Sequence, residues 1–159
     1  MTIQAIPVDH EQWPRFRDAL KSTNLPLDDI ELPGRTFFEF QRDGQTIGWG
    51  GFENCGADGL LRSLVVETAN RSKGMGVAVL QLIEVMAAEQ GIIRLHLLTT
   101  TASGFFERSG YEVRERGSEP ELISQTEQFK GLCPSSACYM SKVLPAELGP
   151  KLTLLSAEK

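Results

Sequence analysis

Apolar and polar residues alternate with a period of two in three stretches of the chain's first third, as they do in half-buried strands. These stretches are residues 2–6, 35–41 and 45–53. The last two are joined by Asp43 and Gly44, a pair typical of the two-residue turn of a hairpin. Residues 60–66 are apolar on both faces apart from Arg62 and Ser63, which predicts a central strand covered on both sides.

The period changes at residues 75–90, where apolar residues recur at the i, i+3, i+4 and i+7 positions of an amphipathic helix. Gly91 is a typical residue at the end of such a helix. An earlier helix is expected after Asp9 as its N-cap, and Pro14 requires this helix to start late. The same patterns predict strands at residues 92–98, 111–116 and 138–143, and helices at residues 102–109 and 121–129. This order predicts a mixed α/β sheet.

The length and composition agree with one globular domain of 159 residues, of which 41% are hydrophobic and 23% charged. We place this domain at residues 1–144 and treat residues 145–159 as a tail. The net charge of −5 argues against a nucleic-acid-binding surface, and no apolar run reaches the roughly 18 residues of a membrane helix. The N-terminus lacks the pattern of a signal peptide, and three cysteines are too few for a disulfide framework. We therefore expect a cytoplasmic protein that binds neither nucleic acid nor membrane.

The junction between the strand at residues 60–66 and the helix at residues 75–90 reads Arg71-Ser72-Lys73-Gly74-Met75-Gly76. Glycines let backbone amides approach an anion, and a helix N-terminus adds a positive partial charge. Arg71 and Lys73 add two cations in the same turn. The glycine spacing is neither that of the Walker loop nor that of the dinucleotide fingerprint. The segment is therefore a candidate pyrophosphate site, and an ordinary basic helix start is the alternative.

The motif R-x-x-G-x-G between a strand and a long helix resembles the acetyl-CoA loop of the GNAT family of N-acetyltransferases. The sequence ASGFFERSGY at residues 102–111 is similar to the family signature A-x-x-F-Y-x-x-x-G-F, and the order of elements over residues 2–144 matches the family. The resemblance implies a GNAT fold, an α/β (α+β) architecture whose mixed central sheet has splayed fourth and fifth strands and flanking helices. It also implies acetyl-CoA as the co-substrate.

The resemblance assigns cofactor-binding roles to residues in three places. One group of residues is expected to pair its backbone with the pantetheine arm, like an added strand: Leu64, Val65 and Val66. A second group is expected to hold the pyrophosphate with backbone amides: Arg71, Ser72, Lys73, Gly74, Met75, Gly76 and Val77. The third group, Phe105 and Phe106, is expected to flank the cofactor from the short helix.

At Phe106 the sequence departs from the family, which usually has there a tyrosine that protonates the departing CoA thiolate. A phenyl ring has no proton to give. Either water supplies the proton, or another donor such as Tyr111, Tyr139 or Ser103 replaces the tyrosine.

Attack on a thioester needs a neutral amine, so an acceptor ammonium must first lose a proton. Glu53, at the end of a predicted strand, is our candidate base or anchor of a relay water, and a surface acid is the alternative.

Arg62 is a charge inside a buried strand, which predicts either a bidentate clamp on a substrate carboxylate or an internal ion pair. Thr99 and Thr100 end the next strand and are candidate substrate contacts, unless they only precede a helix cap at Thr101.

Finer resemblances concern the acceptor. Residues 98–102, 105–111 and 141–144 are similar to amino-acid acetyltransferases of the N-acetylglutamate synthase type. The sequences LRSLVV, LLTTTA and LCPSSA, beginning at residues 61, 97 and 132, resemble the ArsN-type acetyltransferases found with arsenic-resistance genes. These resemblances imply transfer to the amino group of a small amino-acid-like acceptor, such as a glutamate-analogue toxin of the arsinothricin or phosphinothricin type. The alternatives are a protein or peptide N-acetyltransferase and an idle acetyl-CoA-binding sensor; a homodimer is a further expectation.

Cys133 and Cys138 carry soft ligand atoms, but their five-residue spacing is not a recognised zinc pair and no nearby histidine completes a set. We therefore expect no metal and treat buried cysteines as ordinary core residues. His96 alternates within a predicted strand and is expected to be structural, whereas His10 is expected at the surface.

Overall fold

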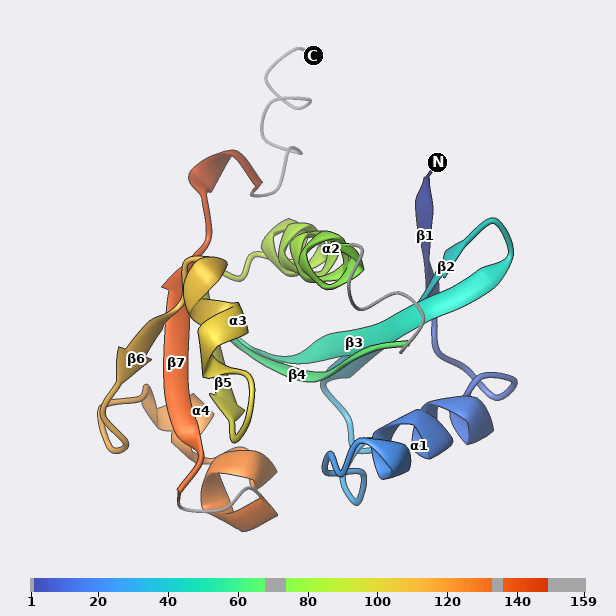
Figure 1. Ribbon diagram of the computed structural model, residues 1–159. Helices are drawn as coiled ribbons and strands as arrows, with labels where there is room; N and C mark the ends of the chain where they lie inside the picture. The colour runs from blue at the N-terminus through green and yellow to red at the C-terminus, as the bar shows by residue number, and fades with distance from the viewer. Residues whose placement is uncertain (1, 68–73, 133–135, 149–159) are drawn as a thin grey trace, which may run out of the picture.

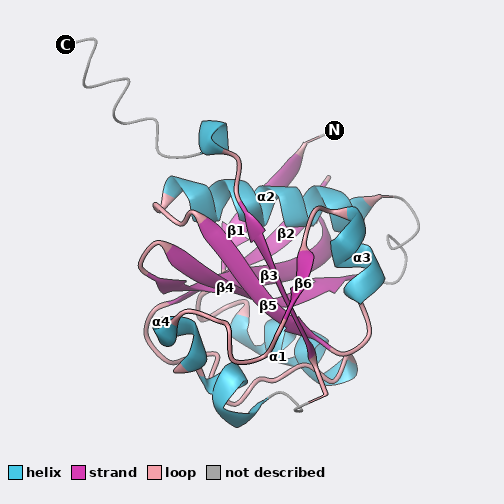
Figure 2. Ribbon diagram, turned by 90° about the vertical axis from the view of Figure 1, so that its left-hand side faces the viewer, coloured by secondary structure: helices cyan, strands magenta, loops and turns pink. Residues whose placement is uncertain are grey.

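The computed structural model describes residues 2–67, 74–132 and 136–148. These residues form a seven-stranded sheet in the order β1-β2-β3-β4-β5-β7-β6, with helices on both faces (Figures 1 and 2). The strands are β1 (Ile3–Pro7), β2 (Arg35–Arg42), β3 (Gln45–Cys55), β4 (Asp58–Val66), β5 (Arg94–Thr99), β6 (Glu112–Arg114) and β7 (Cys138–Val143). The helices are α1 (Trp13–Ser22), α2 (Met75–Glu89), α3 (Ser103–Arg108) and α4 (Glu121–Ser124), with short turns η2 (Gln128–Leu132) and η3 (Ala146–Leu148). Within these described residues, no helix is long and apolar enough to cross a membrane.

The two faces of the sheet carry separate hydrophobic cores. On one face α2 packs Val79, Leu80 and Ile83 against the strands, and α3 adds Phe106 at the edge of the same core. On the other face α1 packs Phe16 and Leu20 against the sheet. Figure 2 shows α2 above the sheet and α1 and α4 below it. Both apolar faces of the central strands are therefore covered, as the sequence of residues 60–66 predicts.

The β2–β3 hairpin turns at the two residues that the sequence singles out. Asp43 and Gly44 both have left-handed backbones, with φ values of 53° and 77°. Two successive positive φ angles define the type I′ turn, whose twist matches that of the flanking strands. The hairpin continues into β4, so three long antiparallel strands form the middle of the sheet.

The sheet divides between β4 and β5. These two strands run parallel, but they pair only from Asp58 with Arg94 to Leu60 with His96 and then diverge. We call this point the fork. A bulge in β4 follows directly, because Trp49 pairs with Val65 and Gly51 with Arg62, which leaves two β4 residues opposite one β3 residue.

Three elements differ from the sequence predictions. The first helix begins at Trp13 with Gln12 as its cap residue, not at Asp9, and the proline expected to delay its start lies in its first turn. Asp9 instead accepts a hydrogen bond from the amide of Glu11. The helix expected at residues 121–129 ends at Ser124, and the Thr126 hydroxyl donates to the carbonyl of Ile123, which favours a turn over a continued helix. The strand expected at residues 111–116 is limited to β6.

Candidate active site

A cavity of about 660 Å³ occupies the space that opens beyond the fork. Its walls come from both faces of the sheet. Gly76 of α2 and Phe105 and Phe106 of α3 line one end. Residues 23–26, which follow α1, line the other end together with Gln128 of η2. The cavity therefore connects the α2 face with the α1 face through the gap between β4 and β5.

The α2 end of the cavity offers a helix N-terminus. Gly74 caps α2 with a left-handed backbone, φ 73°, where a side chain would be strained. A Cβ atom on Gly76 would lie 3.2 Å from Cε1 of Phe105, so a side chain there would press against the Phe105 ring of α3. The first amides of a helix have no partner within the helix and attract an anion. Gly74, Gly76 and their neighbours therefore fit a pyrophosphate, as the resemblance implies.

The other residues expected to bind the cofactor differ in whether they line the cavity. The side chains of Leu64 and Val66 line the cavity, whereas Val65 points to the α1 face and packs with Phe16 and Trp49. The role expected of these three residues belongs to their backbone, so the orientation of the Val65 side chain does not bear on it. Met75 and Val77 open α2 beside the glycines. Arg71, Ser72 and Lys73 lie outside the described residues.

Phe106 packs edge-on against Phe105 and Tyr111, with ring centroids 5.1 and 5.5 Å apart. Neither tyrosine proposed as its substitute lines the cavity. The Tyr111 hydroxyl donates to Glu84 at 2.9 Å, and burial together with that carboxylate raises the Tyr111 pKa well above its ordinary value. The Tyr139 hydroxyl is hydrogen-bonded to Nδ1 of His96 at 2.8 Å, and burial raises its pKa to about 12. Ser103, at the start of α3, is half-buried and also lies outside the cavity lining.

His96 lies between Tyr139 and Asp58, whose Oδ1 is 2.7 Å from His96 Nε2. The imidazole is fully buried at the last residue of β5 that pairs with β4. Burial lowers the His96 pKa more than Asp58 raises it, so the neutral ring is favoured. His96 is therefore the structural histidine that the sequence predicts, and it joins β4, β5 and β7 at the fork.

Arg62 is the centre of a buried ion network. Its two terminal nitrogens bind the two Asp29 oxygens at 2.6 Å each, and Nη1 also binds Glu53 at 2.8 Å. Arg35 Nη2 lies 3.1 Å from Asp29 and 3.4 Å from Glu53. Two arginines thus neutralise two carboxylates. Of the two alternatives for Arg62, the structure shows the internal ion pair, because both terminal nitrogens are engaged by the protein's own carboxylates.

Glu53 takes part in this network and is 4% exposed. It lies near the fork, as expected, but it is not among the residues that line the cavity. Among the described residues, no aspartate or glutamate lines the cavity at all. Its lining consists of apolar side chains, of residues with hydroxyl or amide groups, and of Arg62.

Thr99 and Thr100 line the cavity at the end of β5, where the sequence places them as substrate contacts. The Thr99 hydroxyl accepts a hydrogen bond from the amide of Ala102 at 3.0 Å. The expected cap at Thr101 is absent, since α3 has Ala102 as its cap residue without a side-chain hydrogen bond. Thr99 thus stabilises the turn into α3, and Thr100 is exposed at the cavity.

Three parts of the lining were not predicted from the sequence. Residues 23–26 carry no motif and reach the cavity only because α1 folds back over the sheet. Gln128 is 4% exposed and lies in η2, where the sequence predicts a continuous helix. Ser63 has a left-handed backbone, φ 63°, in the β4 bulge, and its buried Oγ has no hydrogen-bond partner among the described residues. Such strain is typical of functional sites.

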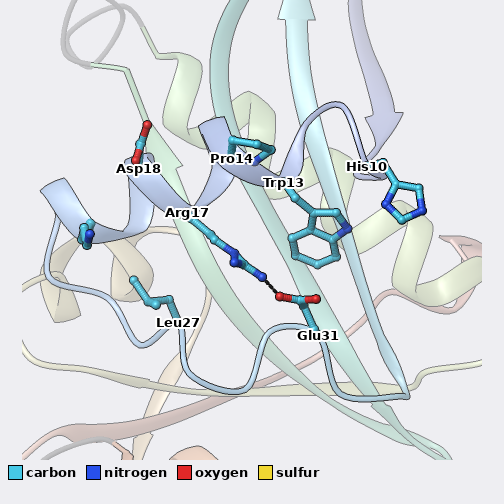
Figure 3. A pocket seen from close by; sticks show the side chains of 8 residues that line it. His10, Trp13, Pro14, Arg17, Asp18, Leu27 and Glu31 are labelled. Atoms are coloured by element: carbon cyan, nitrogen blue, oxygen red, sulfur yellow. Dashed lines mark ion pairs between the residues drawn. The ribbon is translucent and has the colours of Figure 1, made fainter.

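A second hollow, of about 610 Å³, lies over α1 and away from the fork (Figure 3). Arg17 and Glu31 form an ion pair across it, with Trp13 and His10 at one end. His10 is exposed there, as expected. The residues that line this hollow include none of the α2 N-terminus and none of the β4 bulge.

The sequence profile of the acetyltransferase (GNAT) domain matches residues 33–113, which is half of the chain. The chain belongs to the GNAT acetyltransferase family. The matched region contains the fork, the bulge, α2 and α3, whereas residues 23–26, Gln128 and Ala137 of the cavity lining lie outside it. The mixed sheet with β4 parallel to β5 is the fold that the resemblance implies.

Solved structures support the GNAT fold at low sequence identity. N-acetylglutamate synthase from Neisseria gonorrhoeae, in complex with coenzyme A and N-acetyl-glutamate, matches with a TM-score of 0.75, 17% identity and 91% of this chain covered. The match covers 36% of that synthase, so this chain spans about a third of its length. A GNAT acetyltransferase from Staphylococcus aureus matches over its full length, with 91% of this chain covered, a TM-score of 0.72 and 17% identity.

An aminoglycoside 6'-N-acetyltransferase in complex with coenzyme A is also similar, with a TM-score of 0.65 and 17% identity over 91% of this chain and 98% of its own. No curated protein matches the sequence.

Within the described part of the chain, no cluster of three or more His, Cys, Asp or Glu side chains could hold a metal ion. Cys133 lies outside the described residues, and Cys138 is half-buried against the α2-face core.

Proposed function

We propose that this protein transfers the acetyl group of acetyl-CoA to the amino group of a small amino-acid-like acceptor. The observation that carries the proposal is the cavity beyond the fork, which meets a glycine-capped helix N-terminus at one end and a separate wall of loop residues at the other. An arrangement of this kind lets a cofactor and an acceptor enter from opposite faces of the sheet and meet between β4 and β5. Acetyl-CoA supplies an acetyl group activated as a thioester.

At the cofactor end, the α2 amides following Gly74 would hold the pyrophosphate, and the β4 backbone at residues 64–66 would lie along the pantetheine arm. Gly76 and Phe105 both line this end of the cavity. Phe105 and Phe106 provide an apolar wall beside the reacting thioester. The residues named here at the cofactor end bind and enclose the co-substrate, and none of their side chains carries a titratable group.

The described part of the lining offers no carboxylate, imidazole or phenol that could exchange protons with the acceptor ammonium or the CoA thiolate, which favours water in this role. No carboxylate among the described residues faces the cavity, and Tyr111 and Tyr139 both hold their hydroxyls in buried hydrogen bonds elsewhere. We therefore propose that water takes the proton of the acceptor ammonium and that water also protonates the thiolate. Glu53 as the base, or as the anchor of a relay water, stays a prediction, and its position between two arginines argues for a structural role.

A carboxylate-bearing acceptor is supported by two resemblances. The synthase neighbour is described with N-acetyl-glutamate, the product of acetylating an amino acid. Two of the ArsN-type motifs, at residues 61–66 and 97–102, line the cavity, and the third contributes Ala137 to its lining. These motifs support a glutamate-analogue toxin as acceptor and a role in arsenic or antibiotic resistance. Hydroxyl and amide groups of Thr23, Asn24, Thr100 and Gln128 line the acceptor end and could bind such a molecule.

The direct test is thiol release from acetyl-CoA by the purified protein, measured against amino acids, glutamate analogues, polyamines, aminoglycosides and short peptides. Release that depends on one glutamate-like amine, with the N-acetyl product identified by mass spectrometry, would support both the reaction and the acceptor class. Release only with peptides would replace the small acceptor by a protein terminus. Binding of acetyl-CoA without release for any amine would contradict the enzymatic proposal.

One observation favours a second function. Phe106 removes the hydroxyl that the family usually places beside the thiolate, which would suit a protein that binds acetyl-CoA as a sensor without turnover. The same panel separates the two functions, because a sensor binds acetyl-CoA and releases no thiol.

A further inference from the structure

The wall at the acceptor end of the cavity is tied to the rest of the protein at two points. At its beginning, α1 ends in a tight turn in which Asn24 has φ 57° and the Leu25 amide donates to the Leu20 carbonyl at 2.9 Å. These features form a Schellman-type helix end. At its other side, three residues after Pro26, Asp29 is bound by Arg62. Residues 24–29 are therefore a short span held at both ends.

Arg62 connects this span to the reacting region. Its guanidinium binds both Asp29 oxygens at 2.6 Å, and Nη2 approaches the Pro26 carbonyl at 3.4 Å. The same residue lines the cavity and directly precedes Ser63 of the bulge. One side chain thus joins the acceptor wall to the strand that borders the gap. The Arg62 side chain is fully buried and that of Asp29 is 5% exposed, so water does not weaken the pair.

The network does not reach the cofactor end. Its four members, Arg35, Glu53, Arg62 and Asp29, include none of the residues placed at the cofactor end, which are those of α2 and α3 and the β4 backbone at residues 64–66. Loosening the Asp29 contact would therefore move residues 23–26 and leave Gly76, Phe105 and Phe106 in place. A change in Asp29 should act on the acceptor and spare the co-substrate.

We propose that Asp29 is a positioning residue for the acceptor: through Arg62 it holds residues 23–26 against the β4 bulge and so sets the distance between the bound amine and the thioester. The inference rests on the acetyl transfer proposed above. Asp29 itself does not line the cavity, so it acts through the wall and not by contact with substrate.

The test compares Asp29→Asn with Glu84→Gln as a matched control. Glu84 is also a buried acid, 3% exposed, which binds Lys142 at 3.0 Å and accepts a hydrogen bond from Tyr111, but it lies on α2 and away from the acceptor wall. Both variants remove one carboxylate charge from a buried ion pair. A general loss of stability would therefore affect both alike, whereas a loss of positioning would affect only Asp29→Asn.

In Asp29→Asn we expect the acceptor KM to rise about tenfold or more, because a displaced wall loses contacts with the bound acceptor, and a tenfold change of affinity corresponds to about 1.4 kcal/mol. The acetyl-CoA KM should stay within about twofold, since distant sites act independently. Glu84→Gln should leave both constants within the same range. Equal changes in the acceptor KM of both variants, or a parallel rise of the acetyl-CoA KM in Asp29→Asn, would overturn the proposal.

A second readout does not depend on turnover. Amide hydrogen exchange of residues 24–29 should become faster in Asp29→Asn and remain at the wild-type rate in Glu84→Gln. Unchanged protection in Asp29→Asn overturns the positioning role even if the wild type transfers no acetyl group, whereas lack of transfer by the wild type refutes only the proposed function. Should Asp29→Asn fail to fold, Asp29→Glu keeps the charge with a longer side chain. It should then raise the acceptor KM alone, and an unchanged acceptor KM would contradict the proposal.

Discussion

Replacing Arg62 with methionine should destabilise the protein strongly, because two buried carboxylates would lose their main partner. The Arg62 side chain is fully buried and makes contacts of 2.6, 2.6 and 2.8 Å to Asp29 and Glu53. After the substitution only Arg35 remains, at 3.1 and 3.4 Å. Removing one partner of a buried ion pair costs about 3–5 kcal/mol. At about 2–4 °C per kcal/mol for a domain of this size, the melting temperature should fall by about 6–20 °C.

The loss should depend on pH in a defined direction. Burial raises the Asp29 pKa, but the hydrogen bonds and charges of Arg62 and Arg35 outweigh burial and hold it below the ordinary value. The wild-type pair therefore contributes its stability above the unfolded Asp pKa of about 3.9 and loses it as the pH falls through the lowered folded pKa. Without Arg62 the pKa of buried Asp29 should rise. Asp29 of the variant is then protonated at a higher pH than in the wild type, and its protonation removes part of the cost of an unpaired buried carboxylate. The difference between the two proteins should be largest at pH 7 and shrink toward pH 4.

Urea unfolding, followed by circular dichroism at pH 7 and pH 4, measures this difference directly. Arg62→Lys is the control, because it keeps the positive charge without the bidentate geometry and should lose less stability. A loss below about 1 kcal/mol for Arg62→Met at pH 7 would refute the network as a buried ion pair, whose disruption costs more. A small loss of stability combined with a large rise of the acceptor KM would instead favour a clamp on a substrate carboxylate.

Four further predictions follow from the site. Gly74→Glu should abolish acetyl-CoA binding in calorimetry, whereas Gly74→Ala, with the same left-handed strain and open space around its Cβ, should keep it; equal binding by both would contradict a pyrophosphate at this turn. Tyr111→Phe and Tyr139→Phe should each leave kcat within about threefold, since a proton donor contributes about a hundredfold or more. Glu53→Gln should lower stability, and a loss of kcat by about a hundredfold in folded protein, with an altered pH profile, would establish it as the base. Because burial lowers the His96 pKa, the free energy of unfolding should fall as the pH drops below about 6.5, and His96→Gln should flatten this slope.

The sequence predicts those elements whose cause is local. The I′ turn at Asp43 and Gly44, the amphipathic α2 with its stop at Gly91, and the long strands of the hairpin depend on neighbouring residues, and all are confirmed. The first helix starts late, at Trp13, as Pro14 requires, but its cap residue is Gln12 rather than Asp9, whose side chain bonds the nearby amide of Glu11. Helix α4 is shorter than predicted because the Thr126 hydroxyl competes for a carbonyl, which periodicity does not reveal.

The candidate site divides in the same way. Gly76, Leu64, Phe105 and Phe106 belong to motifs within continuous stretches of sequence, and the structure brings them to one cavity. The acceptor wall at residues 23–26 reaches the cavity through the path of the chain over the sheet, for which the sequence has no signal. A single arginine in a predicted buried strand indicates that this side chain has a partner. Which residue is the partner depends on the three-dimensional fold.

The partners of Arg62 illustrate this limit. Asp29 lies in a segment without periodicity, and the sequence indicates Glu53 through its place near the cleft rather than through a pairing. A carboxylate beside a cleft can be a base or an ion-pair partner, and burial between two arginines distinguishes these roles only in three dimensions. The bulge at Ser63 is likewise a property of the β3–β4 register.

Thiol release from acetyl-CoA, measured for the wild-type protein and for Gly74→Glu with a panel of amines, tests whether the cavity beyond the fork carries acetyl transfer. We expect release with a glutamate-like amine by the wild type and none by the variant, together with loss of acetyl-CoA binding by the folded variant. Equal release by both proteins would place the chemistry elsewhere. Binding without release by the wild type, for every amine, would show a protein that holds acetyl-CoA and does not transfer its acetyl group.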